Sequence, residues 1–283
     1  MKKLLIVFTM FFLFVAKPAL ALIEESDNAE QQFEGFNMQG YDDDGNKSWD
    51  LTGRTADIDG GKVHLSDVNA NAYGDQNVNV TSEVGVFDQT SGDVYLEKDV
   101  IITGQDGGQL LTDSLDWSKE NDLVRTDDEI LITDDQFTVT GMGMEAKPGL
   151  KHATIHEDVT VRVNVEDKNA QEPVGDPKTV TITCDGPVEM DQGNGMAVFN
   201  NNVFAIQEDK TLKADKMEIK FDEEMKQIDK MICIGNVEIV QGNNKTLAEK
   251  AVYDGKTQKL TLLGRPKLIL VTEGDNAFTS FGD

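Results

Sequence analysis

Positive charge is scarce in this sequence. Its 283 residues include 26 lysines and arginines against 52 aspartates and glutamates, which gives a net charge of −26. Such a chain repels nucleic acid and anionic membrane surfaces, so we expect no nucleic acid among its partners.

Cysteine is almost absent as well. Cys184 and Cys233 are the two cysteines, so at most one disulfide can form within the chain. Each cysteine stands two residues before a glycine, in similar sequences of six residues. Their strands are expected to be either neighbours or several strands apart. A bond between the two and a pair of free thiols are the two alternatives.

Long hydrophobic runs are missing except at the start. Leu4–Ala16 is an apolar run of 13 residues, shorter than the roughly 18 residues that a membrane-spanning helix needs. Positive residues precede the run and an Ala-Leu-Ala phrase, residues 19–21, follows it, which is the layout of a cleavable signal peptide. Residues 1–21 are therefore predicted to be a signal peptide or, as the alternative, a short N-terminal anchor. Without them the chain carries 23 basic and 52 acidic residues, a net charge of −29.

Catalytic and metal-binding patterns are also lacking. His152 and His156 stand four residues apart, a spacing that pairs ligands on a helix but not on the strand expected here. No serine lies in a nucleophile elbow, and the acidic pairs are no more than this composition produces by chance. We predict no enzyme activity, no catalytic residue, no metal and no cofactor.

Alternation of apolar and polar residues dominates the rest of the chain. Val159, Val161 and Val163 alternate with polar neighbours, as do Met217 and Ile219, which is typical of strands with one buried face. Glycine-containing and asparagine-containing pairs between these runs suit tight hairpin turns. The pattern predicts an all-β, antiparallel fold.

A longer repeat overlies the alternation. A Gly, Asp or Asn residue directly before an apolar residue recurs at intervals of 30, 29, 44, 34 and 29 residues. We predict that a strand ends at each recurrence and that one repeat consists of about three short strands. The marks are Val100, Ile130, Val159, Val203, Val237 and Pro266. The long interval contains residues 166–178, which include two prolines and are predicted to be a linker.

Several phrases of the C-terminal half resemble the OstA/LptA domain of lipopolysaccharide export. They include Gly186-Pro187-Val188-Glu189, Ile234-Gly235-Asn236-Val237 and Leu263-Gly264-Arg265-Pro266, in the order of that domain. Residues 33–165 are similar to LptC, through Val84-Gly85-Val86-Phe87-Asp88, Leu115-Asp116-Trp117 and Gly141-Met142-Gly143-Met144.

The resemblance implies an elongated, twisted antiparallel β-jellyroll with an apolar trough, in two consecutive rolls. We expect an LptC-like roll at 33–165, an LptA-like roll at 179–272 and a polar tail at 273–283. LptC usually keeps its N-terminal anchor, whereas the run here is short and cleavable in pattern, which leaves tethering to the inner membrane open. The expected location is the periplasm.

The same resemblance implies a non-enzymatic component of the lipopolysaccharide transport bridge. The expected partners are lipopolysaccharide, other Lpt jellyroll proteins joined head to tail by strand addition, the inner-membrane ABC transporter and the outer-membrane translocon. The strands around 38–51 and 267–271 are the candidate docking edges, unless they are covered or charged. The alternatives are a structural or adhesive β-solenoid of the envelope and an envelope polysaccharide enzyme, for which the sequence offers no cluster of acids.

A lipid trough needs a continuous apolar lining, because each methylene left in water costs about 0.8 kcal/mol. Apolar residues of the alternating runs are the candidate lining, and their alternative role is to pack an ordinary interior. The candidates are Phe137, Val139, Val161, Val163, Phe199, Phe204, Ile206, Met217, Ile219, Phe221, Ile239 and Leu262.

Overall fold

The computed structural model describes residues 31–270, except for 43, 74–76, 106, 136, 148–151, 166–177, 192 and 223–227. The predicted signal peptide, nearly all of the predicted linker and the predicted tail lie outside the described residues. Within them the chain forms seventeen strands and no helix, so none that could cross a membrane. The strands are β1 (Gln31–Tyr41), β2 (Lys47–Asp59), β3 (Lys62–Ala72), β4 (Val78–Asp88), β5 (Val94–Gly104), β6 (Gln109–Ser118), β7 (Leu123–Thr133), β8 (Phe137–Lys147), β9 (His152–Val165), β10 (Lys178–Cys184), β11 (Val188–Asp191), β12 (Met196–Gln207), β13 (Lys210–Phe221), β14 (Ile228–Gln241), β15 (Asn244–Asp254), β16 (Lys259–Leu263) and β17 (Lys267–Ile269).

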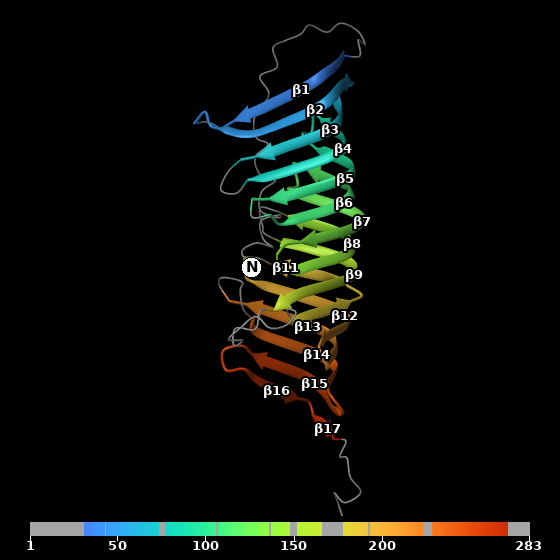
Figure 1. The fold of residues 1–283 in the computed structure, drawn as a ribbon, viewed down its shortest axis with the longest axis vertical. Coiled ribbons are helices and arrows are strands. Elements are labelled where there is room, and N and C mark those ends of the chain that lie inside the picture. The colour runs from blue at the N-terminus through green and yellow to red at the C-terminus, as the bar shows by residue number, and fades with distance from the viewer. Residues whose placement is uncertain are drawn as a thin grey trace, which may run out of the picture.

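The strands follow one another along a single long antiparallel sheet. Each strand from β1 to β9 pairs with the next in sequence, and the same holds from β12 to β16. Figure 1 shows the strands lying across the long axis of the molecule, from β1 at one end to β17 at the other. The predicted all-β antiparallel jellyroll is therefore confirmed.

A line of irregularities crosses the middle of the strands. The pairing register shifts there, for example between Thr81 and Val84 and between Asn200 and Val203. An extra residue bends its strand and turns the sheet back on itself, so each long strand contributes to two facing walls. We call this bend the fold line. Side chains on the inner side of both walls form the core.

The sequence repeat marks this fold line. Five of its six residues directly follow the bend and are 0–1 % exposed at the bottom of the trough: Val100, Ile130, Val159, Val203 and Val237. Asp67 and Gly35 have positive φ directly before Val68 and Phe36, as Asp99 has before Val100. The fold line therefore extends to β1. The prediction that a strand ends at each mark is wrong at these five, because the strand bends and continues. At Pro266 a strand does end, since β16 stops at Leu263 and β17 begins at Lys267. One repeat is therefore two long bent strands rather than three short ones.

The two halves of the chain share this sheet. β9 pairs with β10 and with β11, which together occupy one strand position and both pair with β12. Three consecutive asparagine side chains of β12 hold the break between them: Asn200 donates to the Pro187 carbonyl oxygen (2.9 Å), Asn201 to that of Gly186 (2.7 Å) and Asn202 to the Asp185 carboxylate. The junction between the halves is thus a built part of the sheet.

Candidate functional site

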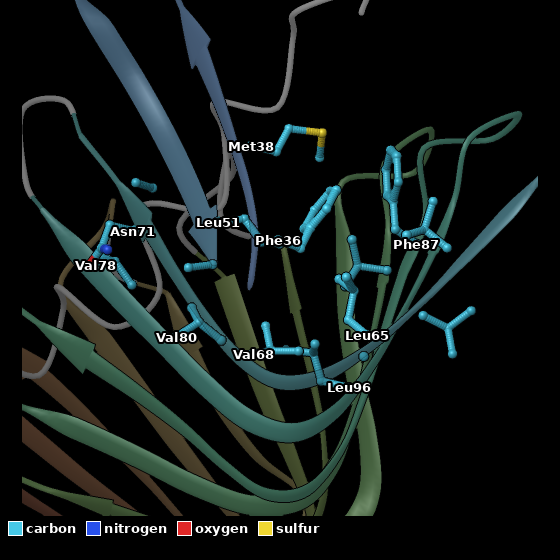
Figure 2. Close-up of a pocket in the computed structure, with 16 residues that line it drawn as sticks. Phe36, Met38, Leu51, Leu65, Val68, Asn71, Val78, Val80, Phe87 and Leu96 are labelled. Carbon is cyan, nitrogen blue, oxygen red and sulfur yellow. The ribbon is translucent and has the colours of Figure 1, made fainter. Parts of the chain in front are cut away.

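An apolar pocket opens between the two walls at the N-terminal end of the sheet. The space that it spans, with the open solvent at its mouth included, is about 830 Å³. Figure 2 shows the strands curving beneath the labelled side chains, which surround the hollow. The lining residues come from β1 to β5 and are apolar apart from one asparagine: Phe36, Met38, Leu51, Val63, Leu65, Val68, Ala70, Asn71, Ala72, Val78, Val80, Gly85, Val86, Phe87, Val94 and Leu96.

Small side chains keep this pocket open. Ala70 and Ala72 are half-buried on one wall, and Gly85 lies on the other. A Cβ atom at Gly85 would lie 2.9 Å from Val68 Cγ2 and 3.4 Å from Leu96 Cδ2, so glycine lets these two side chains pack closely against the wall. The pocket therefore results from residue size as well as from the bend in the strands.

The trough is closed in its middle. Trp117 and Val124 lie near the strand ends of β6 and β7 and are 4 % and 5 % exposed, and Ile132 is 1 % exposed. Val94, which pairs with Trp117, is half-buried at the edge of the open pocket. Towards the other end the inner side chains become exposed again, up to 60 % at Leu268.

The rim of the pocket carries fixed negative charge. In the turn after β4, the backbone N–H groups of Ser91 (3.1 Å) and Thr90 (2.8 Å) donate to Asp88 Oδ1 and lower the pKa of Asp88. In the turn after β1, the Asn46 backbone N–H donates to Asp42 Oδ1 (2.8 Å) and lowers the pKa of Asp42. Both carboxylates are therefore ionised at neutral pH.

The nearby cations face carboxylates. Lys47 Nζ lies 2.5 Å from Asp50 Oδ2, which also accepts from the Tyr73 hydroxyl (2.7 Å). Lys62 stands opposite Asp88 in the pairing of β3 with β4. No described lysine, arginine or histidine lines the pocket itself.

Ten of the twelve predicted lining residues lie on the inner side of the walls. They are Phe137, Val139, Val161, Val163, Phe199, Met217, Ile219, Phe221, Ile239 and Leu262, and all belong to the core or pack against it.

Phe204 and Ile206 face outward, so their prediction as lining residues is corrected. Phe204 pairs with Lys213, whose Nζ lies 5.6 Å from the ring centroid, whereas Ala205 pairs with Leu212 inside. Cross-strand partners share a face, so the alternation turns Phe204 and Ile206 away from the core. Their apolar character alone suggested a lining role.

Cys184 and Cys233 are buried free thiols, so the structure does not contain the disulfide considered above. β12 and β13 lie between their strands β10 and β14, which corresponds to about 14 Å across the sheet, beyond the roughly 7 Å that a disulfide can span. Burial raises the pKa of Cys233 to about 12 and also raises that of Cys184.

This burial predicts an alkaline loss of stability. The Cys233 thiol stays protonated in the fold up to about pH 12 but ionises near pH 9 in the unfolded chain. Its contribution is thus complete below pH 9 and falls by up to about 1.4 kcal/mol per pH unit above it. Urea unfolding between pH 8 and 11 should show the loss, with a shallower slope in Cys233→Ala. Equal slopes would contradict the prediction.

Among the described residues, no three His, Cys, Asp or Glu side chains are placed to hold a metal ion. His152 lies at the start of β9, opposite Asp191 and Lys147, while His156 packs beside Gly143. On a strand this spacing does not bring the two imidazoles together as a ligand pair.

Sequence comparison decides the family. The profile described as "Lipopolysaccharide-assembly, LptC-related" matches residues 3–164, more than half of the chain. The chain belongs to the LptC-related family. A second profile, "LptA/(LptD N-terminal domain) LPS transport protein", matches residues 181–281, and no individual curated protein matches significantly. The predicted order of an LptC-like half and an LptA-like half is confirmed, and this LptC-related protein takes part in lipopolysaccharide transport.

None of the residues that line the open pocket was among the predicted lining. Two signals in the sequence point to them. Asp67-Val68 is an Asp directly before an apolar residue, as Asp99-Val100 is. Val63 and Leu65 alternate with polar residues just as the predicted lining does.

Proposed function

We propose that this chain holds the acyl chains of lipopolysaccharide between its two walls. It takes them up in the N-terminal pocket and passes them towards the C-terminal edge, while the sugars stay in water. The observation that carries the proposal is the pocket itself, an open hollow with an almost wholly apolar lining. Each methylene that enters gains about 0.8 kcal/mol.

Passage beyond the pocket requires the walls to part. The covered side chains of β6 to β9, such as Trp117 and Ile132, occupy the space between the walls. An acyl chain can replace those contacts with its own apolar surface, so opening exposes little hydrocarbon to water. We propose that lipid enters this middle section only as the walls separate around it.

The two terminal strands serve as docking edges in this proposal. Among the described residues, β1 pairs on one side only, with β2, and the short strands β16 and β17 pair only with β15. An unpaired edge can accept a strand from another protein. Head-to-tail joining to other Lpt jellyrolls would connect the inner-membrane ABC transporter to the outer-membrane translocon through one trough. In this arrangement residues 33–165 and 179–272 act as two consecutive rolls, without enzyme activity.

Site-specific photocrosslinking tests the lipid path. A photoreactive phenylalanine at Phe199, on the inner side of β12, should crosslink lipopolysaccharide in cells. The same probe at Phe204 provides a matched control, because it lies on the same strand and faces outward. Equal crosslinking at both positions, or none at Phe199, would reject the proposed path.

A further inference from the structure

No charged side chain lines the pocket among the described residues. Its lining offers hydrocarbon and one amide, and no described cation reaches it. A protein that recognises a phosphate normally supplies arginine, lysine or a helix N-terminus, and the described part of this sheet contains no helix.

Acidic groups dominate the strand ends on both walls. Asp59 is exposed at the turn that ends β2, directly after Ile58, which packs against the core. Asp88 follows Phe87 of the lining, and Asp42 lies in the turn that ends β1. A lipid seated in the pocket therefore places its headgroup near fixed carboxylates.

The local cations do not offset this charge. Lys47 is engaged by Asp50, and Lys62 stands between Asp59 and Asp88 in the pairing of β2, β3 and β4. Lys119 lies against Gly92, in a turn that carries both Asp88 and Asp93. Arg54 pairs with Asp67 (2.7 Å) on the outer side of the fold line. The field that a headgroup meets is thus negative, in keeping with the net charge of −26 for the whole chain.

We propose that the N-terminal pocket recognises hydrocarbon alone and takes lipids whose head carries no net negative charge. A phosphorylated lipid then binds well once divalent cations neutralise its phosphates. The inference rests on the proposed function and deepens it, because it assigns the selecting feature to the rim of the same pocket.

Two amphiphiles with the same chain test this selection. Dodecyl maltoside is neutral and dodecyl phosphate is anionic. Each is titrated below its micelle concentration into the purified full chain at low salt without divalent cations. The maltoside should bind tighter, by about twofold for each pair of unit charges that lie about 10 Å apart in water. Added Mg²⁺ should tighten binding of bisphosphorylated lipid A and leave binding of dephosphorylated lipid A unchanged.

A charge reversal at the rim provides the matched comparison. Asp59→Lys, in the turn between β2 and β3, should raise the affinity for dodecyl phosphate about fourfold in water and leave that for the maltoside unchanged. Asp209→Lys makes the same change in the exposed turn between β12 and β13, away from the pocket, and should alter neither affinity.

The outcomes separate the two proposals. If dodecyl phosphate binds as tightly as the maltoside without Mg²⁺, or if Asp59→Lys changes nothing, selection by charge is wrong and the lipid path stands. If neither amphiphile nor lipid A binds, the pocket holds no hydrocarbon and the proposed function fails as well.

Discussion

Gly186→Ala should destabilise the protein by more than about 3 kcal/mol, because the junction between the halves has no room for a side chain. Gly186 has a φ of +97°, and a Cβ atom there would lie 2.2 Å from the His156 carbonyl oxygen and 2.9 Å from its carbon. Both atoms are backbone of β9, so relief requires the strands to separate. Urea unfolding followed by circular dichroism measures the loss.

A second glycine separates crowding from backbone strain. Gly107 has a φ of +88°, close to that of Gly186, but no atom lies within 4 Å of its Cβ position. Gly107→Ala should therefore cost only the left-handed backbone conformation, about 1 kcal/mol. Similar losses in the two variants would show that contact with β9 does not decide the effect. If Gly186→Ala is insoluble while Gly107→Ala stays soluble, the result would agree with the prediction that contact with β9 decides the effect.

Ala70→Phe should lower lipopolysaccharide binding at least about tenfold, because the ring would occupy space meant for an acyl chain. Displacement of two methylenes, each worth about 0.8 kcal/mol, already accounts for a change of this size. Ala70 lines the pocket and has an extended backbone, so the larger side chain enters without strain. The free energy of unfolding should stay within about 1 kcal/mol, since the ring fills open space.

The matched control for this plug is Thr81→Phe. Thr81 lies on β4 beside Val80 of the lining but pairs with Asn69 on the outer face. It adds the same ring to the outside of the same wall and should leave binding unchanged. The plug model would be wrong if both variants bind lipid as the unaltered chain does, or if both lose binding equally.

Alternation carried most of the information about the fold that a sequence can provide. The period of two identified the strands and put ten of the twelve predicted residues on the correct side of the wall. It failed at Phe204 and Ile206, where side-chain character was weighed above position in the alternation. Val203, at the repeat mark, faces inward and so fixes which residues of β12 alternate inward. After it these are residues 205 and 207 rather than 204 and 206.

Pairing across the junction could not be predicted. β9 and β10 are separated by residues 166–177, and nothing local in that segment indicates that Val161 will pair with Ile182. The position of the open pocket was equally hidden. It depends on the small side chains of Ala70 and Ala72, whereas larger residues such as Leu110 and Ile132 close the middle. Such differences in volume become visible only when two walls face each other.

The direction of the strands also has a mechanical consequence. If the chain links two membranes, thermal motion of the envelope pulls along its long axis, and the strands lie across that axis. Tension therefore falls on the hydrogen bonds between neighbouring strands, all of which stretch together at any one boundary. The first boundary to tear should be one formed by short or broken strands, such as β15 against β16 and β17, so an overloaded bridge would part at its C-terminal joint and leave the body of the carrier folded.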